Sequence, residues 1–196
     1  MQKLIEIRWH GRGGQGAVTA SKLLADAALS EGFYIQAFPE YGAERMGAPV
    51  RSFNRISSEP IKMHCQINEP DIVMVLDETL LETIDVMAGI KNGGSIIINT
   101  SKDPDEVFSL IHHEDDKNIS IHTVDASRIS METIGRVMPN TPMVGALIKK
   151  IDFLKPETLN ETIKKTLSKK VLAPIVEANI IAAKRAYEEV KENACI

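Results

Sequence analysis

Cysteine is scarce in this sequence: Cys65 and Cys195 are the two cysteines among 196 residues, and no CxxC pair occurs. An iron–sulfur cluster usually takes four thiolates, and a structural zinc ion takes four Cys or His ligands in close pairs. The composition therefore excludes both kinds of site at any usual spacing. His64 directly precedes Cys65, but neighbouring side chains on a strand point to opposite faces, so we interpret Cys65 as a half-buried strand thiol and not as a nucleophile.

Long apolar runs and an excess of one charge are also missing. No apolar run approaches the ~20 residues that cross a bilayer, and Lys3, Glu6 and Arg8 interrupt any apolar core of an N-terminal signal peptide. The 23 Lys and Arg residues against 27 Asp and Glu give a net charge of −4, which excludes a surface that binds nucleic acid or anionic lipid throughout. We expect a cytoplasmic protein without a membrane or nucleic-acid partner.

The composition is that of an ordinary globular protein, with 43% hydrophobic and 26% charged residues. A chain of this length buries roughly 70% of its unfolded surface, which is enough for a sizeable core. We find no internal repeat, and the one linker-like stretch is the loop 40–49. The expectation is therefore a single domain that spans residues 1–196.

Alternating strand and helix patterns organise the chain. The segment 72–76 has five apolar residues in succession, which is typical of a strand covered on both faces. Strands separated by helices predict a parallel-dominated sheet with right-handed crossovers, that is, a three-layer α/β/α, Rossmann-like fold of the α/β class. We predict strands at 4–9, 34–38, 72–76, 95–99 and 119–124, and helices at 17–31, 78–88, 127–138, 143–154, 156–168 and 174–192, with a further helix that begins near 103.

One region departs from this alternation. Two runs of alternating apolar and polar residues, 50–56 and 61–67, flank Ser57-Ser58-Glu59-Pro60, which predicts an antiparallel β-hairpin inserted into the α/β chain. Arg51, Phe53 and Arg55 would share one face of its first strand, so we expect part of the hairpin to carry positive charge outward.

A glycine loop is the strongest chemical signal. Gly11, Gly13 and Gly16 follow the GxGxxG pattern between a predicted strand and a predicted helix, which is the context of a dinucleotide or phosphate loop. Glycine lets the backbone approach a diphosphate closely, and the amides and dipole at the helix N-terminus favour negative charge. Arg12 would add a charged donor for a phosphate. The alternative is a glycine turn that only packs the strand against its helix.

Acidic residues near the strand ends allow two interpretations each. A dinucleotide site requires an acidic residue at the end of the second strand, and Glu40 stands behind Pro39, so the match is imperfect. Asp77 and Asp125 follow predicted strands, where a catalytic acid could lie, but a helix N-cap explains each more simply.

Other polar clusters are weaker candidates. Arg45, Arg51 and Arg55 could form a patch for an anionic ligand, although a solvated or interfacial face is commoner. Consecutive residues do not easily converge on one metal ion, so we interpret the run 112–116 (HHEDD) as a solvated loop. The sequence offers no nucleophile, base or metal triad, and we assign no catalytic residue and no metal site.

Three segments carry a resemblance to a known family. They are Arg8–Gly16 (RWHGRGGQG), Phe38–Arg51 (FPEYGAERMGAPVR) and Pro139–Leu147 (PNTPMVGAL). Together they resemble the gamma subunit of pyruvate:ferredoxin oxidoreductase (pyruvate synthase), and the likeness spans essentially the whole chain. The first two motifs are far more specific in combination than the glycine pattern alone.

The resemblance implies a function within a complex. That family cleaves pyruvate oxidatively with coenzyme A to give acetyl-CoA, carbon dioxide and two electrons for ferredoxin, and thiamine diphosphate and 4Fe-4S clusters lie in the alpha, beta and delta partner subunits. This chain alone would bind no cofactor and would be inactive in isolation. It would share the coenzyme A site through its glycine loop, Gly11, Arg12, Gly13, Gly14, Gln15 and Gly16.

Several alternatives remain open at this point. A related branch that acts on 2-oxoglutarate has a similar glycine loop, and a branched-chain 2-oxoacid is a further possible substrate. The pyruvate assignment depends on Trp9-His10 and on the segment 41–45 (YGAER). Outside the family, the chain could be an independent NAD(P)-binding protein with a Rossmann-like fold or an assembly module without a ligand.

Overall fold

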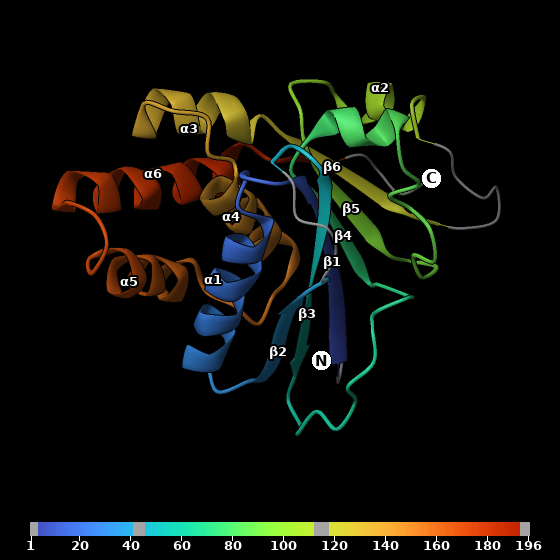
Figure 1. Ribbon diagram of the computed structural model, residues 1–196, viewed down its shortest axis with the longest axis horizontal. Coiled ribbons are helices and arrows are strands. Elements are labelled where there is room, and N and C mark those ends of the chain that lie inside the picture. Colours follow the sequence, from blue (N-terminus) through green and yellow to red (C-terminus); the bar gives the residue numbers. More distant parts are fainter. Residues whose placement is uncertain (1–3, 41–45, 112–117, 193–196) are drawn as a thin grey trace.

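The computed structural model describes residues 4–40, 46–111 and 118–192. In these ranges seven strands form one sheet in the order β2-β3-β1-β4-β5-β6-β7 (Figure 1). Neighbours among β1, β4, β5 and β6 pair in parallel, whereas β2, β3 and β7 pair antiparallel at the two sides of this centre. The strands are β1 (Leu4–Arg12), β2 (Tyr34–Pro39), β3 (Pro49–Ser57), β4 (Ile72–Val75), β5 (Ser95–Asn99), β6 (Ser120–Val124) and β7 (Lys191–Glu192).

The parallel centre of the sheet is buried on both faces, as its sequence predicts. All residues of β4, β5 and β6 are buried. Alternate side chains enter two different hydrophobic clusters: Met74 and Ile97 pack in one, and Val73 and Ile96 pack in the other. A strand with this pattern requires cover on both sides, because successive side chains point to opposite faces.

Helices cover the two faces unequally (Figure 1). One face is covered by the longer helices, and the other carries a 3-10 helix, η1 (Glu78–Glu82), and the short α2 (Pro104–Phe108). The predicted α/β fold with a parallel-dominated centre is confirmed. The helices on the first face are α1 (Ala17–Ser30), α3 (Ala126–Ile134), α4 (Asn140–Lys150), α5 (Pro156–Leu167) and α6 (Ala173–Glu189).

The predicted hairpin of 50–56 with 61–67 is wrong. The first run is β3, but residues 61–67 form no strand. β3 pairs antiparallel with β1 on one side, from Leu4↔Ser57 to Arg12↔Pro49, and with β2 on the other. Because both edges of β3 are occupied, no edge is left for the following run. On this side of the sheet the antiparallel strands are therefore β2 and β3, and residues 61–67 take no part.

The predicted helix 78–88 is shorter than expected. Asp77 is its N-cap, as predicted, and accepts a hydrogen bond from the Thr79 amide at 3.0 Å. The 3-10 helix then ends at Glu82, and Asp85 Oδ1 accepts from the Met87 amide at 2.9 Å. Such a local bond offers the backbone an alternative to the helix. Leu80 and Met87, two apolar residues of the predicted helix, are nevertheless buried.

The remaining helices agree with the sequence except at their ends. Asp125 caps α3 by accepting from the Arg128 amide at 2.9 Å, which favours the N-cap interpretation over a catalytic acid. The last helix ends at Glu189 instead of residue 192, and β7 then pairs with β6 through Thr123↔Lys191. Within the described ranges, no helix combines the length and apolar character that a membrane span requires.

Candidate functional site

The glycine loop connects β1 to α1 at the carboxyl end of the parallel strands. β1 continues three residues further than predicted, so Gly11 and Arg12 belong to the strand. The turn is closed by two short-range bonds: the Gln15 amide donates to the Arg12 carbonyl at 3.0 Å, and the Arg12 amide donates to Gln15 Oε1 at 2.8 Å. The helix begins immediately afterwards at Ala17.

Two of the loop glycines have a backbone that only glycine adopts readily. Gly14 has φ +98° and Gly16 has φ +83°. Gly13 is not among the glycines with positive φ, and it pairs with the chain before β3: its amide donates to the Ala48 carbonyl at 2.9 Å, and its carbonyl accepts from the Gly47 amide at 3.2 Å. The conformational requirement therefore lies at Gly14 and Gly16.

Arg12 is not a free phosphate donor. Its guanidinium donates to Thr79 Oγ1 at 2.8 Å and to the Gly47 carbonyl at 3.2 Å, and it forms an ion pair with Asp77 at 3.3 Å. Gln15 Nε2 donates to the same Asp77 carboxylate at 2.6 Å. Arg12 thus ties the loop to η1 and to the segment before β3, and its charge is balanced by a carboxylate.

The Asp77 carboxylate is held ionised by this network. Burial alone would raise the pKa of Asp77, but hydrogen bonds from Thr79 and Gln15, together with the charge of Arg12, outweigh burial and hold the pKa below its ordinary value. The ionised Asp77 neutralises the charge of Arg12. An anion bound at the loop would therefore be attracted mainly by the backbone amides.

A cavity of about 520 Å³ opens beside the loop. In the described part of the chain, the amides of Gly14, Ala17 and Val18 take part in no hydrogen bond, and all three residues line this cavity. The first amides of a helix have no partner within the helix, and the helix dipole places partial positive charge there. The arrangement is a ready binding site for a phosphate group.

Arg51 and Arg55, which the sequence offered as possible members of an anion-binding patch, both form ion pairs with carboxylates. Arg51 lines the cavity but pairs with Glu40, to which its Nη2 donates at 2.7 Å. Arg55 is 1% exposed and pairs with Glu6 at 2.8 Å, so the expectation of outward positive charge is wrong at this position. The sheet pairing that places β3 between two strands also buries its arginine. Arg45 lies outside the described residues.

Cys65 is also placed differently than predicted. It lies outside any strand and is exposed, and Arg55 Nη2 lies 3.6 Å from its Sγ. The segment 112–116 and Cys195 lie outside the described residues. Among the described residues, no group of three or more His, Cys, Asp or Glu side chains has the arrangement to hold a metal ion.

A buried polar pair that the sequence motifs did not reveal lies next to the loop. Arg8 and His10 are 4% and 2% exposed, and Arg8 Nε donates to His10 Nε2 at 3.0 Å. Arg8 also donates to the carbonyls of Val86 and Ala88. Burial, with the charges of Arg8 and Arg51, lowers the pKa of His10 to about 3, so this imidazole is neutral. In the sequence, Arg8 and His10 alternate with the apolar Ile7 and Trp9, and this alternation was the pattern that could have indicated a polar pair on one face of β1.

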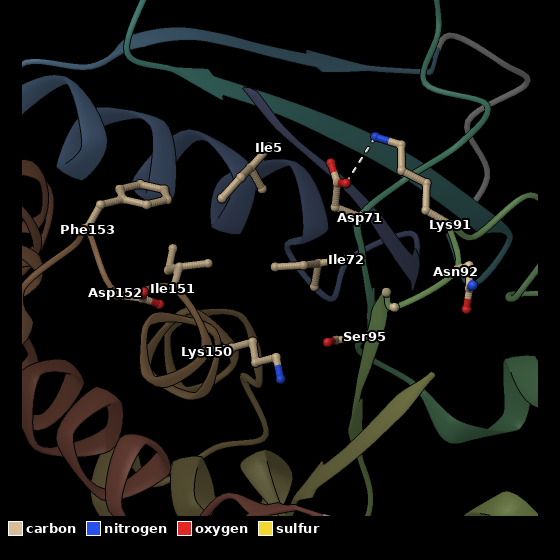
Figure 2. Close-up of a pocket in the computed structure, with 12 residues that line it drawn as sticks. Ile5, Asp71, Ile72, Lys91, Asn92, Ser95, Lys150, Ile151, Asp152 and Phe153 are labelled. Carbon is tan, nitrogen blue, oxygen red and sulfur yellow. Dashed lines mark hydrogen bonds and ion pairs between the residues drawn. The ribbon is translucent and has the colours of Figure 1, made fainter. Parts of the chain in front are cut away.

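A larger cavity, about 640 Å³, lies at the opposite end of the parallel strands (Figure 2). Figure 2 shows Lys91 directed toward Asp71, with which it forms an ion pair at 3.0 Å, and Lys150 at the end of α4. The turn that borders this cavity is also rich in glycine, but the amides of Gly93 and Gly94 both donate to backbone carbonyls. This cavity therefore offers no set of free amides comparable with the glycine loop.

Comparison with known proteins gives consistent matches over the whole chain. The family model described as pyruvate ferredoxin/flavodoxin oxidoreductase matches residues 6–189. Pyruvate synthase subunit PorC of Thermotoga maritima is 46% identical over 190 residues, covering 97% of this chain and 96% of that one. The common gamma subunit of the pyruvate/ketoisovalerate oxidoreductases of Pyrococcus abyssi is 47% identical over 186 residues, or 95% of this chain and 97% of that one.

Solved structures agree with this result. The crystal structure of the Thermotoga maritima PORC subunit has a TM-score of 0.85 at 43% identity, covering 98% of this chain and all of that one. A 2-oxoglutarate:ferredoxin oxidoreductase from Magnetococcus marinus, determined with 2-oxoglutarate, coenzyme A and succinyl-CoA bound, has a TM-score of 0.73. At 22% identity over 96% of this chain and 32% of the longer one, that likeness is one of fold.

Proposed function

Because the chain belongs to the pyruvate ferredoxin/flavodoxin oxidoreductase family, as a gamma subunit of the pyruvate synthase type, we propose that it works inside a complex with alpha, beta and delta subunits. The complex converts pyruvate, coenzyme A and oxidised ferredoxin to acetyl-CoA, carbon dioxide and reduced ferredoxin. The partner subunits carry thiamine diphosphate and the 4Fe-4S clusters, and ferredoxin reaches this chain only indirectly.

The contribution of this chain is part of the coenzyme A site. The observation that carries the proposal is the set of unpaired amides at Gly14, Ala17 and Val18 around the cavity of about 520 Å³. Coenzyme A has a diphosphate of the kind that a helix N-terminus binds. The structure of the Magnetococcus marinus enzyme with coenzyme A bound supports this ligand class.

The charge balance of the site suggests how the diphosphate is held. The two arginines that line the cavity are paired with carboxylates, Arg12 with Asp77 and Arg51 with Glu40. The backbone amides and the dipole of α1 are therefore the main source of attraction, and the side chains shape the loop. The same pairing of Glu40 argues against an NAD(P) site, in which this carboxylate would be needed for the ribose hydroxyls.

The 2-oxoacid is a separate question from the anion site. The similarity to a gamma subunit that is common to pyruvate and ketoisovalerate oxidoreductases favours a second candidate, a chain shared by a pyruvate complex and a branched-chain 2-oxoacid complex. In both cases the substrate would be selected by the partner subunits, and this chain would supply the same coenzyme A contacts.

The proposal is tested in the assembled complex. Gly14→Val should raise the Michaelis constant for coenzyme A, while formation of the thiamine-bound intermediate from pyruvate, measured before coenzyme A is added, should keep its rate. The isolated chain should be colourless and show no pyruvate oxidation. If Gly14→Val leaves the coenzyme A dependence unchanged in a complex that assembles normally by gel filtration, the loop is only a packing turn.

A further inference from the structure

The first residue of α4 packs directly against the glycine loop. A Cβ atom added to Gly16 would lie 2.8 Å from Asn140 Nδ2 and 3.2 Å from Asn140 Cβ. The carboxamide of Asn140 therefore occupies the space that a side chain at Gly16 would need. Gly16 is the N-cap of α1, and no side chain of the described residues caps this helix through a hydrogen bond.

The position of Asn140 is fixed by the protein core. All residues from Asn140 to Ile148 are buried, and α4 packs so closely on α6 that a Cβ atom at Gly145 would lie 2.1 Å from the Ala183 carbonyl oxygen. Asn140 is therefore a rigid support on one side of Gly16, whereas the cavity lies beside the loop and the first turn of α1.

Packing alone does not explain an asparagine at this place. Asn140 is 5% exposed, and its Oδ1 is buried without a hydrogen-bond partner in the described part of the chain. An unpaired buried acceptor destabilises a fold, and an apolar side chain of similar size would pack there without this penalty. An unsatisfied group next to a binding loop is the kind of local cost that marks a functional role.

Two helices begin near the contact between Gly16 and Asn140, and their N-termini determine the electrostatic potential there. α1 begins at Ala17 and α4 at Asn140, and neither has an acidic residue in its first turn. Both dipoles place partial positive charge near Gly16. A neutral carboxamide preserves this field, whereas a carboxylate in the same place would cancel it.

We propose that Asn140 is a positioning residue for the anion pocket: its neutral carboxamide supports Gly16 in the left-handed conformation and keeps the positive field of the two helices available to a diphosphate ligand. This inference rests on the proposed coenzyme A function. It assigns a role in coenzyme A binding to the third sequence motif, 139–147, in addition to its role in the core.

The direct test is Asn140→Asp in the complex purified with its partner subunits. The change keeps the shape and adds a negative charge where the two helices begin. We expect the Michaelis and dissociation constants for coenzyme A to rise on the order of tenfold. Burial of a carboxylate should lower the melting temperature, and the dipoles of the two helices should offset part of this loss. The defect should diminish at acidic pH, where the new carboxyl is protonated.

A second pair of variants tests the contact itself. Asn140→Ala removes the support and should raise the coenzyme A constant by a smaller factor, roughly threefold, since no charge is introduced. Gly16→Ala should be more harmful alone than in the Asn140→Ala background, because the smaller side chain leaves room for the new methyl group. Such coupling is expected only between residues in contact.

The matched control is Asn179→Asp. Asn179 is also 5% exposed but lies on α6, where its Nδ2 donates to the Ile175 carbonyl at 2.8 Å. This variant should lower the melting temperature and leave the coenzyme A constant unchanged.

An unchanged coenzyme A constant in Asn140→Asp, with the complex assembled, would overturn the role of Asn140. A loop variant, Gly14→Ala, then shows what has failed. If Gly14→Ala raises the coenzyme A constant, the pocket stands and only Asn140 is misassigned; if it does not, the coenzyme A site itself is misplaced.

Discussion

The two ends of the parallel strands make an informative comparison, because each borders a cavity and each has a glycine turn. The cavity beside Gly14 and Gly16 measures about 520 Å³, and the cavity beside Gly93 and Gly94 measures about 640 Å³ (Figure 2). The local backbone favours glycine at all four positions. Three of the four have positive φ, and a Cβ atom at Gly94 would lie 2.8 Å from the Lys91 carbonyl oxygen.

The difference lies in the backbone donors. At the larger cavity the amides of Gly93, Gly94 and Ser95 all donate to carbonyls, and Lys91 is paired with Asp71. At the smaller cavity the amides of Gly14 and Ala17 have no partner within the described residues, and a long helix begins there. Cavity volume therefore does not identify the ligand end of this sheet. Unsatisfied donors at a helix N-terminus identify it.

The largest effect is expected from Gly16→Val at the ligand end. The new side chain would combine a positive φ with a collision against Asn140. We expect the free energy of unfolding to fall by about 2 to 5 kcal/mol and the Michaelis constant for coenzyme A to rise more than about tenfold. Urea denaturation and steady-state kinetics of the complex measure the two effects. Wild-type coenzyme A binding in this variant would contradict the assigned geometry.

Acid should weaken the ligand end through His10. Its folded pKa of about 3 lies below the ordinary 6.5, so the unfolded chain binds the proton more readily. The stabilisation is complete above pH 6.5 and is lost as pH falls toward 3. Between pH 6.5 and pH 4 the free energy of unfolding should fall by about 1 to 3 kcal/mol for this reason.

The variant His10→Gln keeps an acceptor for Arg8 without a titrating group, and it isolates this contribution. Its urea midpoint should depend less on pH over this interval than that of the wild type. Burial also lowers the pKa of His122 to about 4, so the titration of His122 contributes to the pH dependence in the same direction and serves as the comparison. Identical pH profiles for wild type and His10→Gln would show that His10 titrates normally.

A matched pair of substitutions separates backbone strain from ligand binding. Gly14→Ala and Gly93→Ala both place a methyl group at positive φ, and in the described ranges no atom beyond the adjacent residues lies within 4 Å of either added Cβ. Each should lose about 1 kcal/mol of stability. Only Gly14→Ala should raise the coenzyme A constant, by roughly three- to tenfold. Equal kinetic effects of the two changes would remove the distinction between the two ends.

The smallest effect is expected from Lys91→Met at the opposite end. Lys91 forms ion pairs with Asp71 and Glu6, but its side chain is 37% exposed. Pairs of this kind contribute less than about 1 kcal/mol. We expect a small stability loss in thermal unfolding and an unchanged coenzyme A constant. A coenzyme A defect here would place ligand contacts at the larger cavity.

The strands of the two halves of the sheet differ in how far their local sequence predicts them. In the parallel half, short apolar runs such as 72–76 and 95–99 were sufficient, because a strand that is buried on both faces has a pattern that few other elements share. In the antiparallel half, alternation correctly indicated a strand at β3 but did not specify its partners. Pairing depends on which strand edges are free in the assembled sheet, and local sequence does not contain that information.

At the candidate site, too, the sequence predicted some features and not others. The position of the loop between a strand and a helix followed from its glycines, and the capping role of Asp77 followed from its place after an apolar run. The engagement of Arg12 by Asp77 and Thr79 did not follow, because these partners are more than sixty positions away. The importance of Gly14 over Gly13 also required the backbone angles.

By itself the sequence determined the α/β class, the order of most strands and helices, the glycine loop and the family, because each depends on local spacing or on a contiguous motif. Only the tertiary structure decided that β3 lies between β1 and β2, that both arginines lining the pocket are paired, and that Asn140 packs against Gly16. The physical reason is distance along the chain. These outcomes depend on which surfaces meet after folding, whereas helices, strands and turns are governed by neighbours a few residues apart.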